Sequence, residues 1–299
     1  MQIQEHTSEL GRWRVAHRAA DPRLRAYVHG YFASSSQLPN QVRERHLPSA
    51  EVPLIINFGA PHRRADPAAN AFRTHDGAWI AGLRDEPALG EAIGERHFMI
   101  VRFTPVGAHL FLGLPMHRLA GRTIALDELD SGLMRRVMAS VGSDSNWRER
   151  FAAMESLIAE RTLTRAMPHI TMRAWDMLSA ADGRTTIASL AAACDCSHRH
   201  LISQFEKCIG VTPKSAARLL RFNRAVRLMN RRAFARHETP AGKPYIEAPA
   251  GPDAKVPDIA WAGIAAGCEY FDQAHFIREF RQFAGATPAA FLQRVTAVD

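Results

Sequence analysis

The chain is 299 residues long, with 46% hydrophobic and 23% charged residues. This length corresponds to about two domains, and the hydrophobic content is enough for real cores, so a disordered or fibrous protein is excluded. Lysine and arginine total 38 against 30 acidic residues, a formal charge of +8 that points to a polyanionic partner, an anionic membrane surface or a need for solubility.

Neither the N-terminal residues nor the cysteines suggest export. Residues 1–10 include Glu5, His6 and Glu9 and no apolar run, so no secretory signal is expected. No apolar segment approaches the roughly 18 residues that span a bilayer. All four cysteines lie in the C-terminal third, without a regular spacing. These features predict a cytoplasmic protein with reduced thiols and no membrane partner.

Short β-branched and aromatic runs mark the first half of the chain. Residues 54–58 and 98–103, and more weakly 79–83, are bounded by proline, glycine or charge and are predicted to be strands. Before them, Asp21-Pro22 favours a helix whose apolar positions continue to Tyr31. After them, helical spacing covers about 133–141 and 147–158. Residues 1–163 are therefore predicted to form a β-rich domain, a barrel or a sandwich, with flanking helices.

From residue 167 onward the strand patterns disappear. Ile170, Trp175 and Leu178 predict a connecting helix within 164–185, which Asp182-Gly183 ends. The segment 186–292 has helical patterns with one interruption, at 231–257, where seven proline and glycine residues predict a long exposed loop. The expected fold class is α+β, with an all-α C-terminal domain.

A repeat with an offset of 75 residues carries the main functional inference. Residues 197–213 match residues 272–288, and each copy follows a short alanine-rich helix that begins at Ile187 or Ile259. The matched pairs are His200/His275, Ile202/Ile277, Phe205/Phe280, Gly210/Gly285, Thr212/Thr287 and Pro213/Pro288.

Each copy has the sequence features of a helix-turn-helix. Ser197 and Asp272 are good N-caps, and apolar residues four positions apart give the following helix one packing face. A glycine then ends that helix and Thr-Pro begins the next. The polar face of such a second helix enters the major groove of DNA. The alternative is an ordinary helical hairpin, but a solenoid of hairpins usually needs three or more repeats.

The positive charge of the chain lies in the first copy and the segment after it. Residues 186–236 hold ten basic side chains and only two acidic ones, so the rest of the chain is neutral. This concentration favours DNA as the polyanion.

These motifs resemble the C-terminal module of AraC/XylS-family transcription regulators, two helix-turn-helix units joined by a linker helix. The most specific match is residues 271–281 followed by Gly285-Ala-Thr-Pro288. The resemblance implies a first unit at 186–211, a linker helix at 212–230, the exposed loop at 231–257 and a second unit at 258–286. It implies a sequence-specific transcription regulator that binds double-stranded promoter DNA as a monomer or homodimer, with RNA polymerase as a further partner.

The N-terminal half resembles, more weakly, the sensor-like domain of one branch of this family. The resemblance rests on residues 101–107 and the helices after them. It implies that residues 1–163 sense a small-molecule effector, mediate dimerisation, or both.

The resemblance also implies which residues contact DNA. Arginine binds guanine and glutamine binds adenine through two hydrogen bonds, whereas isoleucine and alanine offer at most a contact with a thymine methyl group. For the matched histidines, a structural role is equally consistent with the sequence. The groove-facing residues implied are His198, Arg199, Ile202 and Ser203 in the first unit and Gln273, Ala274, His275 and Arg278 in the second.

A further basic set is assigned to DNA phosphates, which supply affinity without sequence information. The alternative is a solvated helix face. The set comprises Lys207, Lys214, Arg218, Arg221 and Arg224.

Two departures from the family pattern affect the geometry. Asp195 and Glu269 stand where the family often has glycine in the turn. If these positions need a positive φ, aspartate tolerates it moderately and glutamate poorly. The long loop either adds no constraint or relaxes the spacing of the two recognition helices, nominally about 34 Å.

No catalytic residue, metal or cofactor is assigned, and an enzyme is not expected. The histidines of the first half lack the spacing of a metal site, and that half has no cysteine to accept a methyl group, as a DNA-repair regulator would need. Cys194, Cys196 and Cys208 have poor zinc spacing. The rival interpretation is a nonspecific nucleic-acid-binding or partner-binding helical scaffold. The histidines concerned are His46, His62, His75 and His97.

Inward-facing strand residues offer a candidate effector pocket. The same residues are what a packed core requires, and core is the favoured interpretation. They are Ile55, Phe58, Met99, Val101 and Phe103.

Overall fold

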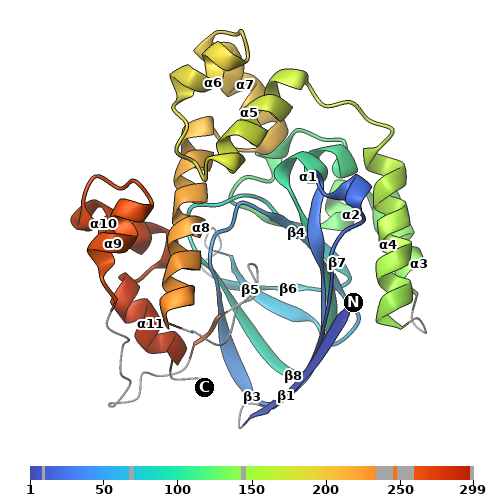
Figure 1. Cartoon of the computed structure of the whole chain (residues 1–299). Coiled ribbons are helices and arrows are strands. Elements are labelled where there is room, and N and C mark those ends of the chain that lie inside the picture. Colours follow the sequence, from blue (N-terminus) through green and yellow to red (C-terminus); the bar gives the residue numbers. More distant parts are fainter. Residues whose placement is uncertain (9–10, 67–70, 143–145, 234–244, 248–258, 297–299) are drawn as a thin grey trace.

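The computed structural model describes residues 1–8, 11–66, 71–142, 146–233, 245–247 and 259–296. A β-rich domain is followed by a helical domain that lies against one side of it (Figure 1). The predicted α+β class, with a barrel-like N-terminal domain and an all-α C-terminal domain, is confirmed.

The N-terminal domain is one strongly curved antiparallel sheet. Its main path runs in the order β1-β2-β3-β8-β4-β7-β9, and the long strand β8 also pairs with β5. Because β8 pairs with three other strands, it bends the sheet toward a barrel. The strands are β1 (Gln2–Ser8), β2 (Gly11–Arg18), β3 (Val28–His46), β4 (Val52–Asn57), β5 (His62–Asp66), β6 (Ala71–His75), β7 (Ala78–Ala81), β8 (Ala88–Phe103) and β9 (Thr123–Ala125).

The two faces of this sheet have different roles. On one face, Leu54 and Ile56 of β4 pair with Val101 and Met99 of β8, and all four are fully buried in the main core. Because side chains alternate along a strand, the neighbouring Ile55 points to the opposite, concave face. The residues predicted to face inward therefore do not share one face. Met99, Val101 and Phe103 are fully buried core residues on the face opposite the cavity, as the favoured core interpretation expects, whereas Ile55 lines the cavity and Phe58 is partly buried.

Helices cover the convex face. Thr104 caps α1 by accepting a hydrogen bond from the backbone N–H of Gly107, and Asn146 caps α4 in a capping box with Glu149. The helices predicted near 133–141 and 147–158 are confirmed. The elements are η1 (Pro22–Leu24), α1 (Pro105–Leu112), η2 (Met116–Arg118), α2 (Leu126–Leu129), α3 (Ser131–Val141) and α4 (Trp147–Thr162).

The helix predicted after Asp21-Pro22 is wrong beyond its first turn. Asp21 does cap a short 3-10 turn, η1, but the chain then enters β3 at Val28. Tyr31 pairs with Val101 of β8 and with Arg18 of β2. Pairing on both sides of β3 thus outweighs a helical spacing of apolar residues.

The C-terminal domain consists of two helix-turn-helix units mounted on one long helix, α8 (Figure 1). α6 and α7 form the first unit, and α9 and α10 form the second. The connecting helix α5 packs against both α6 and α7 and so belongs to this domain. The helices are α5 (His169–Ala180), α6 (Ile187–Ala193), α7 (His198–Ile209), α8 (Pro213–Ala233), α9 (Trp261–Gly267), α10 (Gln273–Ala284) and α11 (Pro288–Thr296).

The exposed loop predicted for 231–257 is only partly correct. α8 continues to Ala233, and residues 245–247 form a strand, β10 (Tyr245–Glu247), that pairs antiparallel with Arg43–Arg45 of β3. Strand β2 pairs with β3 only as far as Gln37, so β10 fills an edge that β2 leaves open. The other residues of the predicted loop, 234–244 and 248–257, lie outside the described part of the chain. None of the described helices combines the length and apolar character that a membrane span requires.

Candidate nucleic-acid interface

The turn of each helix-turn-helix is closed in the same way. After α6, the N–H of Cys196 donates to the carbonyl of Ala191 and the N–H of Asp195 donates to Ala192, a Schellman motif. Asp195 has a φ of 49°. The acidic residue therefore occupies the left-handed position that normally favours glycine.

The second turn repeats this arrangement. The N–H of Tyr270 donates to the carbonyl of Ala265, and Glu269 has a φ of 56°. The Glu269 carboxylate lies 3.3 Å from Arg184, in an exposed ion pair. Both positions do adopt the positive φ that the sequence left open, and the strain falls more heavily on glutamate than on aspartate.

The helices after these turns are capped at both ends. The Ser197 hydroxyl accepts from the N–H of His200, and the Asp272 carboxylate accepts from the N–H of His275. Gly210 ends α7 with a φ of 101°, and Gly285 ends α10 with a φ of 72°. Rigid caps at matched positions fix the length and the direction of both helices.

Each of these helices is anchored by aromatic and aliphatic residues on one side. Leu201 and Phe205 of α7 are fully buried, as are Phe276 and Phe280 of α10. The opposite sides face solvent. Arg199, Ser203 and Lys207 are exposed on α7.

The structure places six of the eight predicted groove-facing residues on these solvent-exposed sides of α7 and α10. Ile202 is half-buried, and His275 is half-buried with its ring edge-on to Tyr270 at 5.5 Å, which supports a structural role for His275. The residues that are exposed are His198, Arg199 and Ser203 on α7 and Gln273, Ala274 and Arg278 on α10.

The predicted phosphate contacts divide into two groups. Lys207 and Lys214 are exposed and make no ion pair within the described residues. Arg218 instead binds Glu279 of α10 at 2.6 Å and Gln282 at 2.7 Å, and Arg221 donates to the carbonyl of Gly183. In this conformation the guanidinium groups of Arg218 and Arg221 face the protein.

Arg224, the last of the predicted phosphate contacts, is also directed inward. It binds the Asp182 carboxylate at 2.6 Å, and the same carboxylate binds Arg227 at 2.6 Å. The Asp182 hydrogen bond raises the pKa of the Arg224 guanidinium. Asp182 thus neutralises part of the charge that the sequence places in this segment.

Sequence reasoning missed three residues of this region. In the sequence Asp182 indicates only a helix stop, and nothing local shows that it binds two arginines of α8. Glu279 is buried, and its partner Arg218 lies 61 positions away. Phe271, in the second turn, is 92% exposed beside the recognition helix. An aromatic residue directly before a polar N-cap was the one signal available for it.

The histidines of the barrel were expected not to form a metal site. Glu44, His46 and His62 nevertheless lie close together, with ligand atoms within 4.8 Å of one another. The Glu44 carboxylate is, however, bound by Arg96 at 2.5 Å, and the same guanidinium lies 3.2 Å from Nδ1 of His62. A metal ion here would have to displace the Arg96 guanidinium from Glu44 and His62.

The remaining histidines and the cysteines have structural surroundings. His75 packs on the ring of Trp79, and His97 contacts Arg150 at 3.2 Å. Cys208 and Cys268 are buried, and burial raises the pKa of both thiols. Buried, protonated thiols are poor nucleophiles.

Comparison with known proteins gives distant similarities. A family model described as a domain of unknown function, DUF6597, matches residues 16–125, which span β2 to β9. No curated protein matches the sequence. Among solved structures, ToxT from Vibrio cholerae O395 aligns over 97% of this chain and 100% of its own, with 8% identity and a TM-score of 0.45.

Two further solved structures align with less than half of the chain. A probable AraC family transcriptional regulator from Rhodopseudomonas palustris CGA009 covers 43% of this chain and 98% of its own, at 22% identity and a TM-score of 0.31. A DNA-binding transcriptional dual regulator from Escherichia coli K-12 covers 44% of this chain and 96% of its own, at 17% identity and a TM-score of 0.31. Similarity of this degree does not by itself assign a function.

Proposed function

We propose that this chain is a sequence-specific DNA-binding transcription regulator of the AraC/XylS type, which reads DNA with α7 and α10. The observation that carries this proposal is the duplicated recognition helix. Both helices follow a Schellman turn, both are capped at each end, and both present a polar N-terminal half to solvent. Two equivalent recognition helices, held by the one long helix α8, are suited to bind two successive major-groove segments of one duplex.

The contacts divide by chemistry. Arg199 and Arg278 are exposed guanidinium groups that can each bind a guanine, and Gln273 can bind an adenine. Lys207 and Lys214 are exposed ammonium groups near the first unit and are better suited to phosphates. Specificity would therefore come from both units and nonspecific affinity mainly from the first.

The rival proposal is a helical scaffold that binds nucleic acid without sequence preference, or binds another protein. Exposed basic residues on α7 and at the start of α8, Arg199, Lys207 and Lys214, would contribute to such nonspecific binding. The two proposals differ in the ratio of specific to nonspecific affinity, which is about 10³ or more for a true operator.

The test begins with fragments of genomic DNA selected by the purified full-length chain. Arg278→Ala should relax the preference at one base pair, lowering affinity for the selected site by about 1–3 kcal/mol while leaving nonspecific affinity almost unchanged. Arg148→Ala is the matched control, since Arg148 is an exposed arginine on α4 of the other domain. Failure to enrich any sequence, with a specificity ratio near one, would favour the scaffold.

We further propose that the barrel domain provides the regulatory input of this protein, by binding a small-molecule effector, by dimerisation, or both. RNA polymerase is the expected further partner of a regulator of this type. The support for a regulatory role is physical contact: the barrel and the helical domain share one hydrophobic core, and α7 packs against α1 and η2. Packed side chains thus connect the barrel to a recognition helix, and a change of state in the barrel would act on the DNA-binding domain through them.

A further inference from the structure

The concave face of the barrel encloses a cavity of about 90 Å³. A second, smaller cavity of about 40 Å³ shares His46, Ile55, Arg64 and Ile100 with it. Since roughly 10–15 Å³ of such space holds one water molecule, the larger cavity alone has room for a molecule of several non-hydrogen atoms.

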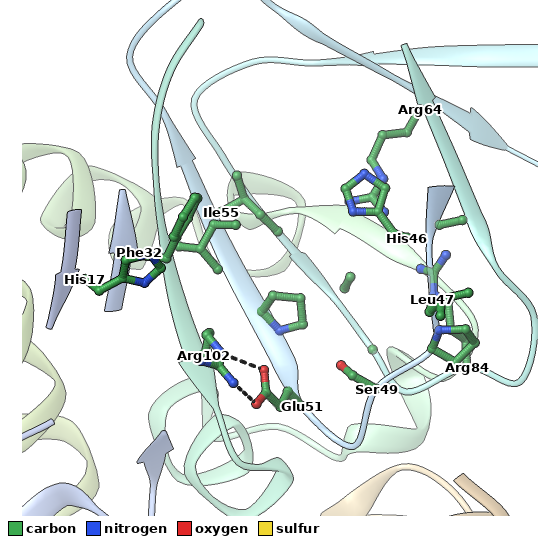
Figure 2. A pocket seen from close by; sticks show the side chains of 16 residues that line it. His17, Phe32, His46, Leu47, Ser49, Glu51, Ile55, Arg64, Arg84 and Arg102 are labelled. Atoms are coloured by element: carbon green, nitrogen blue, oxygen red, sulfur yellow. Dashed lines mark hydrogen bonds and ion pairs between the residues drawn. The ribbon is translucent and has the colours of Figure 1, made fainter. Parts of the chain in front are cut away.

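One wall of the cavity is apolar. Phe32 pairs with Ile100 across β3 and β8, and Ile100 pairs in turn with Ile55 of β4, so the three side chains form one row on the concave face. Figure 2 shows His17 and Phe32 at one side of the cavity, with Arg64 and His46 at the other.

Four arginines line the two cavities, and two of them, Arg96 and Arg102, have a carboxylate partner. Arg102 binds Glu51 at 2.8 and 2.5 Å, drawn as dashed lines in Figure 2. Arg96 binds Glu44 at 2.5 Å. Glu91 of the smaller cavity binds Arg63 at 2.7 Å.

Two arginines of the main cavity lack such a partner. Arg64 is 93% buried with 7% of its surface exposed, and its Nε has no hydrogen-bond partner among the described residues. Arg84 donates to the hydroxyl of Thr123 at 2.9 Å but makes no ion pair within the described part of the chain. The cavity wall thus has a surplus of two positive charges.

This surplus is energetically unfavourable as it stands. Burial and the neighbouring Arg84 lower the pKa of Arg64 to about 9, and burial lowers that of Arg84. Leaving a buried cation unpaired strongly destabilises a folded protein. An anion in the cavity would remove this cost, whereas a metal ion at Glu44, His46 and His62 would increase it.

We propose that the barrel cavity binds a compact organic anion, a carboxylate or a phosphate ester, with its charged group at Arg64 and Arg84 and its apolar part on the row of Phe32, Ile55 and Ile100. A guanidinium group can bind either anion through two parallel hydrogen bonds. This anion would be the effector of the proposed regulator. The inference that it regulates DNA binding therefore rests on the proposed function, whereas the inference that the cavity binds it does not.

The loops that border the cavity also hold the DNA-binding domain. Leu47, Ser49 and Glu51 line the cavity, and between them the N–H of Ala50 donates to Asn223 of α8 at 2.7 Å. The Asn223 amide donates in turn to the carbonyl of Pro48 at 2.8 Å.

The second border reaches the second recognition helix. Next to Arg84, the Asp85 carboxylate accepts from the Gln282 amide of α10 at 3.3 Å. Strand β3 pairs with β8, which follows the loop that holds Arg84 and Asp85. From β3, Arg45 donates to the carbonyl of Ala284 at the end of α10 at 3.1 Å. An anion that moves Arg84 therefore acts within one residue of a contact with α10.

Binding is tested first without DNA, by thermal unfolding and calorimetry of the full chain. The probes are cyclohexanecarboxylate, cyclohexyl phosphate, inorganic phosphate and the neutral cyclohexylmethanol. We expect one or both organic anions to raise the unfolding temperature, with no effect of the alcohol, and the better of the two identifies the anionic group. Arg64→Met should weaken binding about tenfold or more, because it removes a charged hydrogen-bond donor.

Arg14→Met is the matched control, since it removes the same charge from an exposed position of the same domain. If Arg64→Met does not fold, Arg84→Met serves in its place. Equal effects of the alcohol and the anions, or binding that survives both arginine substitutions, would overturn the proposal. A full effect of inorganic phosphate alone would overturn the assignment of the apolar row.

Regulation is tested separately, on DNA selected by the chain itself. We expect the bound anion to change affinity for this DNA in the unmodified protein and to have less effect in Asn223→Ala, in which anion binding itself is retained. An anion that binds without any effect on DNA affinity would overturn the regulatory half and leave the cavity assignment intact. A chain that selects no DNA would refute the proposed function but not the binding of the anion.

Discussion

Arg218 distinguishes two roles for the basic residues of α8, binding of DNA phosphates and stabilisation of the fold through an ion pair with Glu279. Its Nε lies 2.6 Å from a Glu279 carboxylate that is only 6% exposed, whereas its own side chain is 26% exposed. The guanidinium also stacks over the ring of Phe283 at 5.3 Å. We expect Arg218→Met to destabilise the protein, because it keeps the length of the side chain but leaves the buried carboxylate without a cation.

The magnitude follows from this geometry. Removing one partner of a buried ion pair costs roughly 3–5 kcal/mol. Because Arg218 is partly exposed, water reaches the pair, and an expected loss of about 2 kcal/mol is more realistic. The double substitution Arg218→Met/Glu279→Met should recover most of it, since an apolar pair replaces the ionic one. Lys214→Met, one turn earlier on α8 and exposed, should change stability by no more than about 0.5 kcal/mol.

Urea unfolding measures stability, and DNA titration at several salt concentrations measures phosphate contacts. If Arg218 is structural, the double variant keeps the salt dependence of the unmodified protein. If Arg218 binds a phosphate, both variants lose about 0.9 from the slope of log affinity against log salt. A stable Arg218→Met protein with a reduced slope would refute the structural role.

Three further predictions address the turns, the bases and the barrel. Glu269→Gly should raise the free energy of unfolding by roughly 0.5–1 kcal/mol, because relief of a positive φ outweighs an exposed ion pair, and a lower unfolding midpoint would contradict this. Lys214→Ala should weaken binding to all DNA sequences alike, unlike Arg278→Ala, and a sequence-dependent loss in competition titrations would move Lys214 to the base contacts. Burial lowers the pKa of His46 to about 4 and that of His62 to about 3. Below about pH 6.5 the unfolded chain therefore takes up protons at these histidines while the folded chain does not. The free energy of unfolding should fall by roughly 1.4 kcal/mol per pH unit for each histidine between pH 6 and 4. His46→Gln/His62→Gln should flatten this dependence in urea unfolding at pH 7 and pH 5, and an unchanged slope would show that other groups cause it.

The helix-turn-helix units were predictable because their signals are local. A cap, a packing face and a terminal glycine all fall within the 12 residues of α7 or their immediate neighbours. The same pattern repeated 75 positions later confirmed the assignment within the sequence itself. Even the positive φ of Glu269 could be anticipated, because the position in the turn dictates it.

The barrel was less predictable because its strands depend on distant partners. Residues 33–37 of β3, mostly small and polar, have no strand pattern of their own and pair with residues 95–99 of β8. Arg64 lies in a polar run, His62–Asp66, that resembles an exposed loop until the sheet closes over it. The contact between Arg218 and Glu279 likewise joins residues 61 positions apart, so no local pattern predicts it.

Strand β10 makes the two domains inseparable in a practical sense. It comes from the stretch of chain between α8 and α9, yet it completes an edge of the barrel, and α11 contacts it. Along the sequence, the barrel is therefore followed by the first helix-turn-helix unit, then by a strand that belongs to the barrel sheet, and then by the second unit. A C-terminal fragment that starts at residue 164 would keep both helix-turn-helix units but lose the pairing of β10 with β3. The relative position of the two units in such a fragment would therefore differ from that in the whole chain.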